Sequence, residues 1–211
     1  MEPRLLDLSN DPRRAHFDYF RTMAHPYVGV TANCDITLLR EKTVREGLPF
    51  FLSLLYCAVN AANEICELRR RIRGDAAVEY ACCDSSHTVA LPDGSYCYCR
   101  LNCAKPFDIF LPYAQAETKR VKSAPDIDDG EDGEDGEQLF FVSSLPWISF
   151  TGLTMPTPCP ADSNPRITFG RFFPQEGKIL LPVNLTAHHA LVDGLHIARF
   201  FAALERRAAE F

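Results

Sequence analysis

The sequence predicts an α/β fold in which a mixed β-sheet packs with helices in a single domain, residues 1–211. Stretches that alternate apolar and polar residues, as strands do, are interspersed with stretches of helical spacing. The length of 211 residues, with 46% hydrophobic and 24% charged residues, suits one large core. Neither a repeat nor a linker-like segment divides the chain.

The first half of the chain predicts three helices and four strands. Asp11-Pro12 is typical of a helix start, and this helix should extend to about Met23. A strand over 27–36, a short helix over 37–46 and a long core helix over 49–71 follow. Short strands are expected over 78–81, 88–91 and 95–101.

The segment from Asp126 to Glu137 holds eight acidic residues and no Lys or Arg. Such a run cannot bury apolar surface, so an acidic surface loop is predicted at about 125–138. Its glycines stand where a calcium loop needs side-chain oxygens, which argues against a metal site. The elements predicted after it are strands over 139–143, 148–151, 166–173 and 178–189, and a last helix with the buried stripe Ile197, Phe200, Phe201 and Leu204.

The bulk properties indicate where the protein works. A net charge of −6 argues against nucleic acid as a partner, and no apolar run is long enough to cross a membrane. The N-terminus lacks the apolar core of a secretory signal, so a cytoplasmic location is expected. The nine cysteines are then expected to be reduced, most of them acting as small apolar residues.

The run over 180–194 carries the clearest chemical signal. An apolar strand pattern ends in His188-His189, and Asp193-Gly194 begins four residues after the second histidine. Alternation places His189 on the same face as the aliphatic residues of the strand, where a desolvated imidazole on rigid backbone would suit a general base. The histidines could equally be hydrogen-bonded core residues, with Asp193 simply the N-cap of the last helix. The spacing leaves both interpretations open.

Two other chemistries fit the spacing less well. Adjacent residues on a strand point to opposite faces, so His188 and His189 cannot easily share an ion, and the cysteines lack the paired spacing of a zinc site. No cysteine lies in the basic, helix-start surroundings that would make it a nucleophile. The sequence therefore predicts no metal and favours histidine-driven chemistry.

The motif over 188–196, His-His-Ala-Leu-Val-Asp-Gly-Leu-His, resembles the His-His-x-x-x-Asp-Gly signature of CoA-dependent acyltransferases. The nearest match is the chloramphenicol acetyltransferase family. Arg-Arg-Ala-His-Phe at 13–17, the landmarks at 35–37 and 67–69, and Ser-Ser-Leu-Pro-Trp-Ile-Ser-Phe at 143–150 resemble that family in the same order. The resemblance covers nearly the whole chain and implies the acyltransferase fold and a homotrimer with sites between subunits.

The resemblance also implies a role for individual residues. His189 would remove the proton from the acceptor hydroxyl, Ser143 would hydrogen-bond the oxyanion, and Thr168 would orient a water molecule. Asp193 would pair with Arg13 to hold the catalytic loop. The CoA side would be formed by Trp147, Arg171 and Phe172, and the acceptor pocket by Phe20, Val28, Thr88, Cys97 and Met155.

The expected function is O-acetyl transfer from acetyl-CoA, as co-substrate, to a small hydroxylated acceptor. Val28 and Cys97 stand where drug-acetylating relatives carry pocket phenylalanines, and a pocket without aromatic walls would hold a nitroaromatic antibiotic less well. Chloramphenicol is therefore one candidate acceptor and another small alcohol a serious second. Acyl transfer to a dihydrolipoyl thiol, or a catalytically silent binding protein on the same scaffold, are the alternatives.

Overall fold

The computed structural model describes residues 2–125 and 136–211, so most of the predicted acidic loop at about 125–138 lies outside the described residues. The helices are α1 (Arg14–Phe20), α2 (Thr37–Arg45), α3 (Phe50–Glu64), the 3₁₀ helix η1 (Cys66–Arg69), α4 (Phe107–Ser123) and α5 (Gly194–Glu210). The strands are β1 (Arg4–Leu6), β2 (Tyr27–Asp35), β3 (Arg70–Arg73), β4 (Ala76–Glu79), β5 (Asp84–Ala90), β6 (Tyr96–Leu101), β7 (Leu139–Ser144), β8 (Arg166–Phe169), β9 (Phe173–Gln175) and β10 (Lys178–His188).

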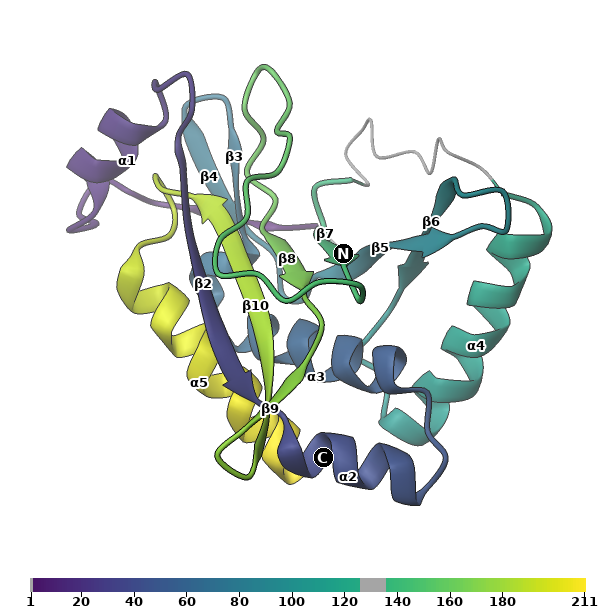
Figure 1. Cartoon of the computed structure of the whole chain (residues 1–211). Helices are drawn as coiled ribbons and strands as arrows, with labels where there is room; N and C mark the ends of the chain where they lie inside the picture. Colours follow the sequence, from purple (N-terminus) through teal and green to yellow (C-terminus); the bar gives the residue numbers. More distant parts are fainter. Residues whose placement is uncertain (1, 126–135) are drawn as a thin grey trace.

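The larger sheet is the mixed sheet that the sequence predicts. Its strand order is β2-β10-β8-β7-β5-β6, and β9 pairs with β10. The strands β5, β7 and β8 are parallel neighbours, whereas the other pairs are antiparallel. The strands β1, β4 and β3 form a separate antiparallel sheet. Figure 1 shows α5 beside α3 at one side of the molecule and α4 beside β6 at the other.

The strand β10 lies inside the sheet, between β2 and β8. Its alternate residues Leu181, Val183, Leu185 and Ala187 are fully buried, as the apolar pattern predicts. They share a hydrophobic core with the buried face of α3 and with Phe200 and Leu204 of α5. The strand therefore provides a rigid support for the residues that follow it.

The long helix predicted over 49–71 is wrong beyond Glu64. Backbone at Ile65 is extended, η1 follows, and β3 begins at Arg70. Arg71 supplies the reason, because its fully buried guanidinium donates to the carbonyls of Leu68 and Leu139, each at 2.9 Å. These bonds tie β3 to β7, and a continuing helix would not place Arg71 there.

The predicted strand over 148–151 is also absent from the described structure. Instead, the amide of Arg171 donates to the carbonyl of Ile148 at 2.8 Å, and the Ser149 hydroxyl donates to the carbonyl of Arg171 at 2.6 Å. Gly170 permits this close approach, since a Cβ there would stand 2.9 Å from the ring of Phe150. The segment is an irregular strap against the end of β8, and it carries Trp147.

The helix α4 and the strands β1 and β3 have no counterpart among the elements predicted from the sequence. The helix α4 buries Phe110, Ala114 and Val121 and tolerates Pro112 near its start. The predicted start of the first helix at Asp11-Pro12 is two residues early, because the Asp11 carboxylate accepts from the amide of Arg13 and α1 begins at Arg14. Within the described residues, no helix is both long and apolar enough to cross a membrane.

Candidate active site

His189 immediately follows the last residue of β10. Its amide donates to the carbonyl of Pro26 at 2.7 Å, so the backbone at this point is fixed to the residue before β2. Its ring nitrogen Nδ1 lies 2.9 Å from the carbonyl of Val192. A carbonyl can only accept, so Nδ1 carries the proton and Nε2 keeps its lone pair. The imidazole is half-buried and is oriented for proton abstraction at Nε2.

The neighbouring His188 is in a different environment. It is buried, its Nδ1 accepts a hydrogen bond from the amide of Ala190 at 3.2 Å, and its ring meets Tyr27 edge to face. Burial lowers the pKa of His188 to about 4, so the ring stays neutral at pH 7. These contacts fit a structural role for His188 and distinguish its environment from that of His189.

Arg13 and Asp193 hold the turn that carries His189. The Arg13 guanidinium donates to the Asp193 carboxylate and, at 3.3 Å, to the carbonyl of His189. Asp193 is the N-cap of α5, where its carboxylate accepts from the amide of Leu195 at 3.0 Å. The amide of Asp193 in turn donates to Nδ1 of His196 at 3.1 Å. The turn is thereby bound to the starts of both α1 and α5.

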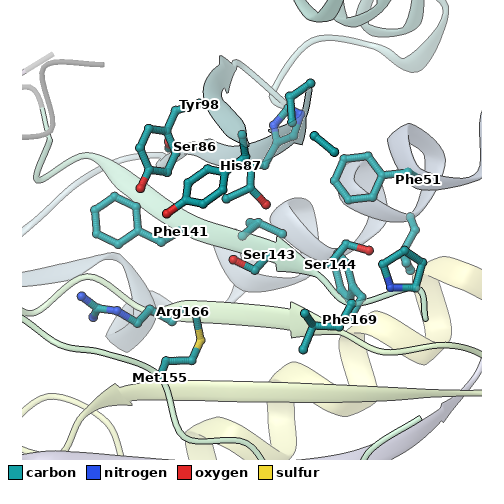
Figure 2. Close-up of a pocket in the computed structure, with 18 of the residues that line it drawn as sticks. Phe51, Ser86, His87, Tyr98, Phe141, Ser143, Ser144, Met155, Arg166 and Phe169 are labelled. Carbon is teal, nitrogen blue, oxygen red and sulfur yellow. The ribbon is translucent and has the colours of Figure 1, made fainter. Parts of the chain in front are cut away.

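A cavity of about 1200 Å³ opens on the other part of the sheet. Figure 2 shows Tyr98, Phe141 and Arg166 toward one end of it and Phe51, Ser144 and Phe169 toward the other. Six residues that the sequence assigns to the site line this cavity: Thr88, Ser143, Trp147, Met155, Arg171 and Phe172.

Ser143 and Thr168 lie opposite each other on the parallel strands β7 and β8. The Thr168 hydroxyl is buried and donates to the sulfur of Met155 at 3.1 Å. Ser143 is half-buried, and Figure 2 shows its hydroxyl beside the cavity. Ser143 and Met155 therefore line the cavity, whereas Thr168 contacts Met155 without lining the cavity itself.

Within one chain the structure does not bring His189 to these hydroxyls. Asn184 faces Thr168 across the β10–β8 ladder, and His189, just past the end of β10, lies five residues farther along the chain. At about 3.3 Å per residue this separation is roughly 16 Å. His189 does not line the cavity. The chain thus carries two half-sites, a histidine with Phe20 at one place and a cavity with Ser143 at another.

Three residues expected in the acceptor pocket lie outside the cavity. Phe20 stacks on the imidazole of His189, and Val28 faces Ala187 across the β2–β10 ladder, so both belong to the histidine half-site. For Cys97, the structure contradicts the expected place in the acceptor pocket. This residue is fully buried on the opposite face of β6, and its thiol lies 3.8 Å from the carbonyl of Val121 in α4.

The cavity is also not stripped of aromatic walls, contrary to the expectation from Val28 and Cys97. Tyr96, Tyr98 and Phe141 line it. The alternation over 95–101 is the sequence pattern that could have indicated this aromatic wall, because it places Tyr96 and Tyr98 on the face opposite Cys97. Asp162 and Arg166 line the same end of the cavity, and neither was among the predicted site residues.

Phe50 and Phe172 line the cavity, and Arg40 packs against both rings without lining the cavity itself. The guanidinium of Arg40 lies over the ring of Phe50 at 5.5 Å and over the ring of Phe172 at 5.4 Å. Arg171 is exposed beside them, and Trp147 is 73% exposed. An exposed indole next to cations at a cavity mouth suits a ligand that carries both flat apolar and anionic groups.

No group of three or more His, Cys, Asp or Glu side chains able to hold a metal ion occurs in the part of the chain that the structure describes.

Comparisons with known proteins find a family model and relatives that match nearly the whole chain. The family model for chloramphenicol acetyltransferase matches residues 1–205. The chain is 28% identical over 202 residues to chloramphenicol acetyltransferase 3 of Escherichia coli, covering 94% of this chain and 93% of that protein. It is 29% identical over 211 residues to the chloramphenicol acetyltransferase of Streptomyces acrimycini, covering 99% and 95%.

Solved structures show the same fold. One described as chloramphenicol acetyltransferase superposes with a TM-score of 0.84 at 27% identity, covering 98% of this chain and 99% of that one. The cubic core of the pyruvate dehydrogenase multienzyme complex superposes with a TM-score of 0.67 at 21% identity, covering 93% and 86%. At that identity the second likeness concerns the fold alone.

Proposed function

Because the chain belongs to the chloramphenicol acetyltransferase family of CoA-dependent acetyltransferases, we propose that it transfers acetyl from acetyl-CoA to a hydroxyl of a small acceptor, with His189 as general base. The observation that carries this proposal is the hydrogen bond from Nδ1 of His189 to the carbonyl of Val192. That bond fixes the tautomer whose Nε2 can accept a proton.

The chemical steps follow from the two half-sites. An alcohol is a poor nucleophile until its proton is removed, and removal by a positioned imidazole contributes about 10²–10⁴-fold. Attack on the thioester carbonyl places negative charge on its oxygen, and the Ser143 hydroxyl is the proposed donor to that oxyanion, a role typically worth about 10²–10³-fold. Thr168, opposite Ser143, is the proposed support for an ordered water at the same intermediate. When the intermediate collapses, the C–S bond breaks, the imidazolium of His189 returns its proton to the sulfur, and CoA leaves as a thiol while the acetyl ester remains on the acceptor.

The site is proposed to form between two copies of the chain. Nε2 of His189 and the hydroxyl of Ser143 must reach the same carbonyl, yet in one chain His189 is roughly 16 Å along the strand direction from Thr168, the residue opposite Ser143. A second copy can bring its His189 to this cavity without any change of fold. A homotrimer, as the family resemblance implies, is the proposed assembly.

Acetyl-CoA is the proposed occupant of the end of the cavity that Phe50 and Phe172 line, with Arg40 packed against both rings. An adenine ring suits the exposed Trp147, and phosphates suit Arg40 and Arg171. Chloramphenicol is one candidate acceptor, because the relatives named above are described as acting on it. A role in antibiotic resistance depends on that acceptor, and a cytoplasmic location stays a prediction from the sequence.

A thiol-release assay with acetyl-CoA tests the proposal. The wild-type protein should release CoA in the presence of chloramphenicol or another small alcohol, and His189→Ala should keep its fold and lose turnover about 10²–10⁴-fold. The matched control is His16→Ala, since His16 is exposed on α1. Turnover with dihydrolipoamide but no alcohol would favour the thiol acyltransferase alternative. No turnover with any acceptor, or a His189→Ala variant as active as wild type, would contradict the proposal.

A further inference from the structure

One end of the cavity holds a charged pair. Arg166 begins β8, two residues before Thr168 and on the same face of the strand. Its side chain is 8% exposed, whereas that of its partner Asp162 is 25% exposed, and both line the cavity. At about 3.3 Å per residue, Arg166 lies roughly 7 Å from Thr168 along β8.

The pair has a fixed geometry. The guanidinium donates from Nη1 and Nη2 to the two carboxylate oxygens of Asp162, at 2.8 and 2.7 Å. The rings of Tyr27 and Phe141 lie near the guanidinium carbon, with centroids at 5.7 and 5.4 Å. The Tyr27 hydroxyl also donates to Asp162, at 2.9 Å. Arg166 and Asp162 therefore cannot easily rotate away from the cavity.

This geometry limits which ligand groups the end of the cavity accepts. The carboxylate of Asp162 is an acceptor only, so it favours a ligand group that donates a hydrogen bond. The guanidinium beside it is a donor only, so it favours a group that accepts. A hydroxyl group does both, whereas a nitro group has no donor and would meet the carboxylate without a hydrogen bond.

We propose that Arg166 and Asp162 select the acceptor. The acceptor would carry, roughly 7 Å from its reacting hydroxyl, a second hydroxyl or similar group that both donates and accepts, as in a sugar, a polyol or a phenol. This inference rests on the proposed function, because it takes the part of the cavity at Ser143, which lies opposite Thr168, as the place of acetyl transfer. It disfavours the nitrophenyl ring of chloramphenicol at this end.

Two acceptors that differ in one group test the selection. Both are N-acyl phenylpropane-1,3-diols, one with a para-nitro group as in chloramphenicol and the other with a para-hydroxyl group. The wild-type protein should prefer the para-hydroxyl compound in kcat/KM by about 10- to 100-fold, the effect of one hydrogen bond to a charged group. The double variant Arg166→Met/Asp162→Leu, which leaves no unpaired charge, should lose this preference while keeping its KM for acetyl-CoA.

Controls separate selection from folding and from catalysis. Arg70→Met/Glu79→Leu removes a partly buried pair of similar kind outside the cavity and should keep the wild-type preference. Arg166→Lys keeps the charge but loses the two-pronged geometry, so its preference should be intermediate. Calorimetric binding of the two diols gives the same comparison without turnover, so failure of acetyl transfer and failure of selection are distinguishable. Equal affinities, or a preference that the cavity double variant retains, would overturn the inference.

Discussion

The imidazole of His189 stacks on the ring of Phe20, with ring centroids 4.0 Å apart and planes inclined by 27°. Phe20 is the last residue of α1, and Arg13, one residue before that helix, donates to the carbonyl of His189. A short helix from the N-terminal region thus holds the ring at the end of β10. The orientation of the proposed general base depends on a contact between residues that are far apart in the sequence.

Replacing Phe20 should lower turnover without unfolding the protein. An aromatic stack is worth about 0.5–1.5 kcal/mol, so Phe20→Leu is expected to reduce kcat about 2- to 10-fold through a less constrained imidazole. Steady-state kinetics should show little change in the KM for acetyl-CoA. Ile109→Ala, at an exposed position on α4, is the control and should retain wild-type turnover. A Phe20→Leu enzyme with unchanged kcat would show that the stack has no part in positioning.

The two roles of Asp193 can be separated by substitution. Asp193→Asn keeps an N-cap for α5 and loses the charge that pairs with Arg13, whereas Asp193→Ala loses both. Urea unfolding at a fixed protein concentration should show that Asp193→Ala costs about 1 kcal/mol more than Asp193→Asn. Both variants should lower kcat, because both release the turn that carries His189. Equal unfolding free energies for the two variants would contradict the capping role.

His87 should make stability depend on pH in a defined window. It is buried on β5 against Phe51, its Nδ1 has no hydrogen-bond partner among the described residues, and burial lowers its pKa to about 4. The unfolded chain binds this proton below pH of about 6.5, but the folded protein does so only near pH 4. Above about pH 6.5 the titration of His87 therefore does not lower the unfolding free energy. Below that pH it lowers the unfolding free energy by up to about 1.4 kcal/mol per pH unit toward pH 4.

The His87→Gln variant removes this titration. Urea unfolding at pH 7, 6 and 5 should show that the unfolding free energy of the wild type falls more steeply with decreasing pH than that of the variant. Identical pH slopes for the two proteins would mean that folding does not lower the pKa of His87.

Local patterns of the sequence were sufficient for some parts of the fold. The alternation over 178–189 and the Asp193 cap predict β10 and α5 because both depend on residues close together in the chain. The end of α3 depends on Arg71 reaching carbonyls of distant segments, which no local pattern reveals. Cys97 was assigned to the acceptor pocket from the resemblance to the family, whereas the alternation over 95–101 places it on the face opposite Tyr96 and Tyr98.

The candidate site divides in the same way. The spacing of the motif indicates His189 and Asp193, and the resemblance of segment 143–150 to the family indicates Ser143. The pairing of Arg166 with Asp162 arises where a proline-rich connection meets the start of β8, and nothing in the spacing alone indicates that the pair faces the cavity.

Mixing two inactive variants is the most direct test of the central claim, that His189 of one copy works at the cavity of another. His189→Ala and Ser143→Ala should each be nearly inactive alone. If the site forms between copies, co-assembly of the two in equal amounts creates interfaces where one chain supplies His189 and the other supplies Ser143. About a quarter of wild-type activity per site should then return, because each site draws its two halves from a random pair of chains. Co-assembled oligomers that stay as inactive as the separate variants would contradict a site built from two copies.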